Sequence, residues 1–357
     1  MNTCLICINS SRSAIGDSFK DICNSLYDKP NIFVIKSNSY EDKEFKTASN
    51  KLLNLEFNKG KLSSYLNVKK WLEIKRFIRD NQIQHLFFYS DNPANIIFQT
   101  INLKQKYSFW WHDPVPHSGV SNKKVYLYSF ATRKLLQNPE NIFVASNSLK
   151  NMACNLNFNY DTAKLKVLEL PFIGDLVKNG EKIKYEDRQY DFIFFGRIEE
   201  YKGLDILYKA IKKLKKDKYS FSALIVGSGE INRYFPEDDL EEVKIVNRYV
   251  ENEELSEFIS DSRVAIFPYK DSTGTQAVQT SLFFECQIIA TDTGSFKEYL
   301  SFGNSKIGKV IEPNNVDELY ESMKEYLNRK HYSYDITEIE KRFSVNDFSE
   351  RLYNIIN

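Results

Sequence analysis

The sequence has few cysteines and no long apolar run, and each shortage excludes a class of protein. Five cysteines occur in 357 residues, and Cys4 and Cys7 are not followed by a second Cys/His pair at metal-ligand spacing. We therefore expect buried, reduced thiols rather than a disulfide framework or a zinc site. No apolar stretch approaches the roughly 20 residues that span a bilayer, and the polar segment NSSRSAIGDS argues against a signal peptide. We expect a soluble cytoplasmic protein, peripheral on a membrane at most.

Charge is distributed unevenly between the two halves of the chain. Residues 1–170 hold 23 Lys and Arg against 14 Asp and Glu, a net charge of +9, and residues 171–357 hold 26 against 34, a net charge of −8. A basic first half suggests an anionic partner, either a phosphorylated acceptor or the face of an acidic membrane. Uneven but solvated surface charge explains the same numbers. No nucleic-acid partner is expected.

Short apolar runs alternate with helical patterns along the whole chain, which is typical of parallel sheets covered by helices. The runs of the first half are CLICI, NIFVIKS, HLFFYS, YSFWW and NIFVAS, and those of the second are Asp191–Phe195, Ala223–Val226, Val264–Phe267 and Ile288–Ala290. We expect two doubly wound, Rossmann-like α/β domains facing a central cleft. Their predicted bounds are 1–172 for the first domain, 173–189 for a linker, 190–340 for the second domain, and 341–357 for a helix packing across the domains.

Glycines and cations follow the first two strands of the second half. Gly196, Arg197 and Lys202 come just after the run Asp191–Phe195, and Gly227 and Gly229 come after the next run. In open α/β sheets, ligands bind at the carboxyl ends of the strands. A guanidinium and an ammonium five residues apart can converge on one diphosphate, and each charge-assisted hydrogen bond contributes roughly 1.5–3 kcal/mol. The sequence therefore predicts a site for a phosphorylated ligand.

A hydroxyl-rich loop follows the third strand of this half and leads into a helix expected to start near Thr275. Backbone amides and hydroxyls of such a loop can surround a phosphate, and the helix N-terminus adds partial positive charge. The alternative is an ordinary N-capped helix. The residues assigned to the phosphate are Ser272, Thr273, Gly274, Thr275 and Gln276.

The strongest feature of the first half is the segment WWHDPVPHSG. His112 follows an apolar run directly, with Asp113 beside it and His117 five residues later. A histidine at the carboxyl end of a strand, next to a carboxylate, suits acid/base work or polar contact with a substrate. We assign His112 to the reaction centre, and Asp113 and His117 to the acceptor side.

The segment Leu66–Asp80 has helical periodicity and carries five Lys and Arg residues beside aromatic and aliphatic side chains. Such a helix can lie on an anionic membrane surface. A core-facing apolar stripe with a solvated basic back explains the pattern equally well.

At this point the chain resembles a known group of enzymes. The series FGRI, YKGLD, LIVGSGE, FPY and IIATDTGSFKE resembles the donor domain of GT-B glycosyltransferases of family 4 (group 1), and HDPVPH, NIFVASNS and ELPFIGD resemble the acceptor half. The resemblance implies that Arg197 and Lys202 bind the donor diphosphate and that His112 contacts the donor sugar. It also places the nucleotide base against the backbone around Asn247–Val250, which includes Arg248 and Tyr249.

The chain departs from that family at two positions. The family usually has two glutamates eight positions apart, and the alignment places Ser272 and Thr280 there. The first glutamate usually contacts the donor sugar and the second the ribose, so both contacts would have to differ here. The chain also contains no Asp-x-Asp motif of the metal-dependent glycosyltransferases. We therefore expect metal-independent transfer with no cofactor other than the sugar nucleotide.

The resemblance implies a retaining transfer from a UDP- or GDP-linked sugar to a saccharide or a polyprenyl-diphosphate-linked saccharide. The expected setting is bacterial surface polysaccharide synthesis at the inner face of the plasma membrane. Two alternatives remain open from the sequence. One is an inactive scaffold or binding subunit, which the missing glutamates favour, and the other is a sugar-nucleotide epimerase on the same fold with Asp113 as its carboxylate.

Overall fold

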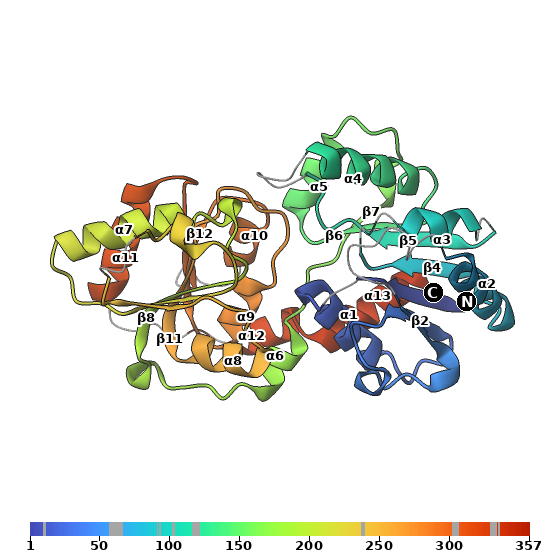
Figure 1. Ribbon diagram of the computed structural model, residues 1–357, viewed down its shortest axis with the longest axis horizontal. Coiled ribbons are helices and arrows are strands. Elements are labelled where there is room, and N and C mark those ends of the chain that lie inside the picture. The colour runs from blue at the N-terminus through green and yellow to red at the C-terminus, as the bar shows by residue number, and fades with distance from the viewer. Residues whose placement is uncertain are drawn as a thin grey trace. The chain divides into compact units, whose positions relative to one another are not determined.

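The computed structural model divides the chain into two units, and each is described by itself (Figure 1). The first unit holds the described residues up to Gly174 together with Ser344–Asn357, and the second holds Asp175–Phe343. The structure describes residues 1–9, 12–56, 67–90, 92, 94–101, 104–115, 122–236, 240–301, 307–328, 334 and 336–357.

The first unit contains a seven-stranded parallel sheet with the strand order β3-β2-β1-β4-β5-β6-β7. Leu5 in β1 lies opposite Val34 in β2 and Phe87 in β4. The central strands are covered on both faces, which explains why the sequence shows them as continuous apolar runs. The strands are β1 Thr3–Cys7, β2 Ile32–Ser37, β3 Leu52–Leu55, β4 His85–Phe88, β5 Lys106–Trp110, β6 Ile142–Val144 and β7 Leu165–Val167.

The second unit contains a six-stranded parallel sheet with the strand order β10-β9-β8-β11-β12-β13. The strands are β8 Tyr190–Phe195, β9 Ala223–Val226, β10 Val243–Val246, β11 Ser262–Phe267, β12 Gln287–Thr291 and β13 Gly308–Ile311. Its helices are α6 Gly174–Asn179, α7 Leu204–Lys216, α8 Asn252–Ser260, α9 Ala277–Phe283, α10 Phe296–Leu300, α11 Val316–Asn328 and α12 Ile336–Arg342. The two parallel sheets with flanking helices confirm the predicted fold class of two Rossmann-like α/β domains.

Helices cover both faces of the first sheet (Figure 1). Because parallel crossovers are right-handed, α1 lies on one face, while α2 to α5, which carry the chain in the opposite direction across the sheet, lie on the other. α13 packs against α1, and α3 packs against both α2 and α4. The helices are α1 Ala14–Ser25, α2 Val68–Asp80, α3 Asn95–Ile101, α4 Asn122–Leu135, α5 Asn147–Cys154 and α13 Val345–Ile356.

The structure adds elements that the sequence did not predict. α1 begins inside the polar segment that follows β1, because Ser13 caps the helix by accepting a hydrogen bond from the amide of Gly16. The edge strands β3, β10 and β13 were not predicted. Each is partly exposed along its length, so none shows the continuous apolar run that marks a buried strand.

The segments expected to link the units and to close the chain are both ordered. α6 and the 3₁₀ turn Tyr185–Asp187 lie within residues 173–189. In α13, Phe348 packs its ring 5.5 Å from that of Trp110, and Tyr353 donates a hydrogen bond to Asn31. By its contacts α13 belongs to the first unit, whose core it completes.

The basic helix α2 turns its apolar stripe to the core. Trp71, Ile74 and Ile78 are buried, while Val68 and Leu72 stay exposed beside the cations. The core-facing interpretation of this segment therefore accounts for three of its apolar side chains and leaves two in solvent. None of the described helices combines the length and apolar composition needed to cross a membrane.

Candidate active site

The loops after β8 and β9 pack backbone against backbone at the carboxyl edge of the second sheet. A Cβ atom added to Gly227 would lie 1.8 Å from the carbonyl oxygen of Gly196, and one added to Gly229 would lie 2.5 Å from that of Ile198. Only glycine permits such an approach. The three predicted glycines therefore bring the two loops together, and the amide of Gly229 is held by the side chain of Asn247 after β10 at 3.2 Å.

The predicted cations lie on the loop after β8. Arg197 is 70% exposed and pairs with Glu199 at 3.0 Å. The Lys202 ammonium lies 3.9 Å from the ring centroid of Tyr269 and 4.9 Å from that of Tyr201. Burial raises the pKa of Tyr269, so its ring stays neutral and attracts the ammonium as a cation–π partner. Sequence reasoning missed both tyrosines, although Tyr269 belongs to the FPY segment that follows a buried strand.

The loops after β8 and β11 are also joined. Gly203 has φ +69°, and a Cβ atom there would lie 1.9 Å from the carbonyl oxygen of Pro268. The amide of Lys270 donates to the carbonyl of Tyr201 at 2.7 Å. Arg197, Lys202 and the hydroxyl-rich loop therefore belong to neighbouring segments of one sheet edge.

The turn after β12 forms hydrogen bonds with the hydroxyl-rich loop. The amide and hydroxyl of Ser295 donate to the carbonyl of Thr273 at 3.2 and 3.3 Å. Ser272, Thr273 and Gln276 are buried, and Gly274 and Thr275 are half-buried. The following helix, α9, begins at Ala277, whose amide is capped by the Thr275 hydroxyl at 3.1 Å. With seven residues α9 is short, so any phosphate contact would come from the loop itself.

Thr280, at one of the two positions where the family has glutamate, lies wholly inside the second unit. It is 0% exposed, and its hydroxyl has no hydrogen-bond partner. An unsatisfied buried hydroxyl is uncommon in folded proteins. Ser272, at the other position, is 7% exposed. Neither side chain supplies a carboxylate, so a sugar or ribose contact here would have to use hydroxyl or backbone groups.

The residues assigned to the base lie after the edge strand β10. Arg248 forms an ion pair with Glu254, with Nη1 and Oε2 at 2.8 Å, and this hydrogen bond lowers the pKa of Glu254. Tyr249 is 53% exposed. Both side chains lie on the surface beside the Asn247 that fixes the glycine loop.

In the first unit, His112 lies at the carboxyl edge of β5. Its Nε2 lies 2.7 Å from the carbonyl oxygen of Tyr89, so Nε2 carries the proton and Nδ1 is the atom left for another partner. The imidazole is half-buried and packs against the rings of Tyr89 and Trp110. Asp113 follows and is exposed, while His117 lies outside the described residues.

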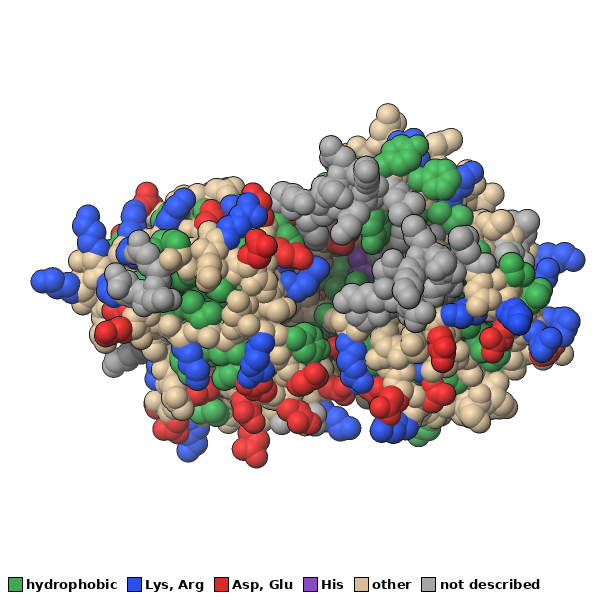
Figure 2. Space-filling model, viewed as in Figure 1, with side chains coloured by type: hydrophobic (Ala, Val, Ile, Leu, Met, Phe, Trp, Pro, Cys, Tyr) green, Lys and Arg blue, Asp and Glu red, His purple; other side chains and the backbone are tan. Residues whose placement is uncertain are grey.

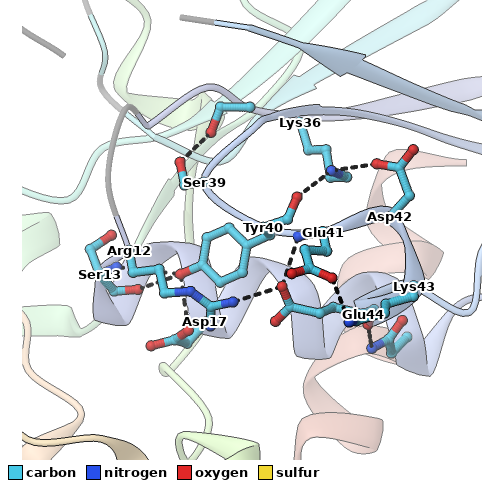
Figure 3. Close-up of polar contacts among 12 residues, drawn as sticks. Arg12, Ser13, Asp17, Lys36, Ser39, Tyr40, Glu41, Asp42, Lys43 and Glu44 are labelled. Atoms are coloured by element: carbon cyan, nitrogen blue, oxygen red, sulfur yellow. Dashed lines mark hydrogen bonds and ion pairs between the residues drawn. The ribbon is translucent and has the colours of Figure 1, made fainter. Parts of the chain in front are cut away.

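A polar cluster that sequence reasoning missed fastens the loop after β2 to the start of α1 (Figure 3). The Tyr40 hydroxyl donates to Asp17 at 2.9 Å, and the buried Lys36 ammonium binds the carbonyl of Tyr40 at 2.6 Å and Asp42 at 2.7 Å. Burial raises the pKa of Tyr40, which keeps its hydroxyl protonated as a donor. The signal in the sequence was a lysine inside the apolar run NIFVIKS.

Two further observations concern other kinds of site. A cavity of about 160 Å³ lies at the amino edge of the second sheet, opposite the loops described above, and is lined by Tyr185, Asp191, Phe192, Arg263, Val264, Tyr326 and Leu327. Among the described residues, no group of three or more His, Cys, Asp and Glu side chains could hold a metal ion.

Comparison with known proteins relates this geometry to a family. Residues 178–343, nearly the whole second unit, match the model of the family described as Glycosyl transferases group 1. A search of curated proteins finds no match. Among solved structures, HepE from Anabaena in complex with UDP and glucose has a TM-score of 0.75 at 11% identity, covering 99% of this chain and 98% of that one.

Two other structures are similar over the same length. A glycosyltransferase from Rickettsia africae has a TM-score of 0.68 at 17% identity, covering 99% of this chain and 97% of that one. The apo form of WaaB, a lipopolysaccharide outer core galactosyltransferase, has a TM-score of 0.68 at 12% identity, covering 99% and 98%. The fold is GT-B. The family match and the GT-B fold together support glycosyltransferase as the class of activity.

Proposed function

We propose that this protein is a glycosyltransferase that moves a sugar from a UDP- or GDP-linked donor to a saccharide or lipid-linked saccharide, with retention of configuration and without a metal ion. One observation carries the proposal: at the carboxyl edge of the second sheet, Arg197 and Lys202 lie on a loop that packs, through glycines, against the neighbouring loops. The hydroxyl-rich loop, with buried Ser272, Thr273 and Gln276, belongs to the same edge. Similar structures bind UDP and UDP-glucose, which supports a nucleotide sugar as donor.

Arg197 and Lys202 would bind the donor diphosphate. Arg197 would exchange its exposed ion pair with Glu199 for phosphate oxygens, and Lys202 would approach from its seat on Tyr269. Positive charge held at this place stabilises the diphosphate as negative charge develops on it during departure of the sugar. The chain has no Asp-x-Asp motif to hold a divalent ion there, so the two cations and the loop amides would neutralise the leaving group.

His112 would orient the donor sugar through Nδ1, because Nε2 is engaged by the Tyr89 carbonyl. Ser272 and Thr280, which stand where the resembled family has glutamates, supply no carboxylate that could act as a nucleophile. Retention would then proceed by attack of the acceptor on the face that the diphosphate leaves. The leaving phosphate would accept the acceptor's proton.

The acceptor would be a sugar of a bacterial surface polysaccharide, carried on a polyprenyl diphosphate at the inner face of the plasma membrane. WaaB, a similar structure, acts on lipopolysaccharide outer core, which supports a saccharide acceptor. The basic first half of the chain supports an anionic carrier.

Thermal unfolding in the presence of UDP, GDP, ADP, dTDP or CMP tests the donor assignment. A bound nucleotide at about 100 times its dissociation constant adds roughly 2.7 kcal/mol of stability. We expect one nucleoside diphosphate to raise the melting temperature of the wild type and to lose this effect in Lys202→Ala. The matched control is Lys209→Ala, an exposed lysine of α7, which should leave the shift intact. Absence of any shift in the wild type would refute the donor assignment.

A second candidate function is a subunit that binds the nucleotide sugar without transferring it. The observation that favours it is the burial of Ser272 and Thr280 at the two positions where the family has glutamates. Donor turnover by the wild type, lost in Lys202→Ala, would reject this candidate, whereas nucleotide binding without turnover for any saccharide acceptor would support it.

A further inference from the structure

Helix α4 of the first unit presents aromatic side chains to solvent. Tyr126 is 77% exposed and Phe130, one helical turn later, is 48% exposed, whereas Ala131 and Leu135 are buried. Figure 2 shows hydrophobic side chains beside cations over this helix, at the top of the first unit. Neighbouring exposed aromatic side chains on one helix are unusual for a surface that only meets water, and they mark interaction sites.

The charged residues in the sequence of α4 have one sign. α4 contains Lys123, Lys124, Arg133 and Lys134 and no acidic residue. The whole segment between Asp113 and Glu140 is free of Asp and Glu. A helix whose charged residues are all positive, and which also exposes aromatic rings, attracts an anionic surface and offers it apolar contacts.

Helix α2 extends the same surface. It shares a face of the sheet with α4, and α3 packs against both helices. Val68 is 67% exposed and Leu72 is 59% exposed, one turn apart, so α2 also exposes a pair of apolar side chains. The exposed cations of α2 are Lys69, Lys75, Arg76 and Arg79, and they outnumber its two exposed carboxylates, Glu73 and Asp80, of which Asp80 pairs with Arg79 at 2.8 Å. Two parts of the chain far apart in sequence therefore contribute exposed apolar pairs and cations to one layer of helices, which we call the α2–α4 face.

We propose that the α2–α4 face binds the surface of an anionic phospholipid bilayer. Tyr126 and Phe130 would enter the headgroup region, where aromatic rings concentrate in membrane proteins, and the lysines and arginines would contact lipid phosphates. An acidic protein would match the charge, but it would not by itself explain apolar pairs exposed on two helices. The inference deepens the proposed lipid-linked acceptor, and it can fail separately, because vesicle binding needs neither donor nor acceptor.

Sedimentation of the full chain with vesicles tests the inference. One set of vesicles is phosphatidylcholine alone and the other is an equimolar mixture of phosphatidylcholine and phosphatidylglycerol. We expect binding to the anionic vesicles that weakens with salt and little binding to the neutral ones. Replacing one exposed cation on each helix, as in Arg76→Gln/Lys134→Gln, should lower the partition coefficient about 30-fold, since each cation near the surface is worth about 1 kcal/mol.

The apolar part is tested with Tyr126→Ser/Phe130→Ser, which should lower binding about tenfold at low salt. The matched controls are Tyr27→Ser, an exposed tyrosine that follows α1 on the other face of the sheet, and Lys43→Gln, an exposed lysine after β2. Both should bind like the wild type, and nucleotide-induced stabilisation should be equal in all variants. Equal binding to both vesicle types, or equal loss in the controls, would overturn the inference. So would a dimer in sedimentation velocity that Tyr126→Ser/Phe130→Ser dissociates, because the face would then pair two copies of the chain.

Discussion

The loops at the carboxyl edges of the two sheets, where we propose that substrates bind, are held in different ways. In the second unit the loops after β8, β9 and β11 touch through backbone atoms, and glycines stand wherever two loops meet. In the first unit the loop after β2 is held by the side chains of Lys36 and Tyr40, and His112 rests on aromatic rings. Under the proposed function, the ribose diphosphate is the same in a UDP- or GDP-linked donor, so a rigid backbone frame would suit it. An acceptor varies, and side chains can be exchanged without rebuilding the loops.

The largest expected effect tests the backbone frame. Gly227→Ala would place a Cβ atom 1.8 Å from the Gly196 carbonyl oxygen, and neither group is the flexible end of a side chain. We expect a loss of about 3 kcal/mol or more in the free energy of unfolding, measured by urea denaturation, because a clash between two backbone segments cannot be relieved by moving a side chain. Gly196→Ala is the control. It meets no atom within 4 Å and carries only the strain of φ +131°, about 1–3 kcal/mol. Equal losses in the two variants would show that contact between the loops is not what requires glycine.

The next effect tests the side-chain frame of the first unit. Lys36→Met keeps most of the buried volume but removes the ammonium that binds the Tyr40 carbonyl. Hydrogen bonds from charged groups contribute about 1.5–3 kcal/mol, and we expect a loss within this range in urea denaturation. Faster amide hydrogen exchange should appear in the loop after β2. Lys43→Met, at a lysine that is 80% exposed, should change little. An unchanged exchange pattern in Lys36→Met would mean that the loop does not depend on this cluster.

The same contrast explains what the sequence could predict. Buried parallel strands appear in the sequence as continuous apolar runs, so the two Rossmann-like domains could be predicted. The partly exposed strands β3, β10 and β13 could not, because they lack such runs. The glycine loops of the donor side were readable because a backbone contact restricts the residue type. The contact between the Lys202 ammonium and the Tyr269 ring could not be predicted, because the two residues follow different strands, β8 and β11, which are neighbours only in the folded sheet.

The smallest expected effect concerns the contact between Lys202 and Tyr269. It tests whether a side chain also contributes to nucleotide binding at a site formed mainly by backbone contacts between loops. Tyr269→Leu removes the ring beneath the Lys202 ammonium, and a cation–π contact contributes about 0.5–2 kcal/mol. The dissociation constant of the stabilising nucleotide should rise roughly 2- to 30-fold in calorimetry. Tyr269→Phe keeps the ring and should bind like the wild type, which separates the ring from the hydroxyl. Because Tyr269 is buried, the melting temperature of each unliganded variant must be measured alongside, and binding must be compared where both variants are folded. Equal weakening in the phenylalanine variant would show that the hydroxyl positions Lys202. Unchanged binding in the leucine variant would show that the Tyr269 ring does not contribute to nucleotide binding, which would then depend on the glycines and cations.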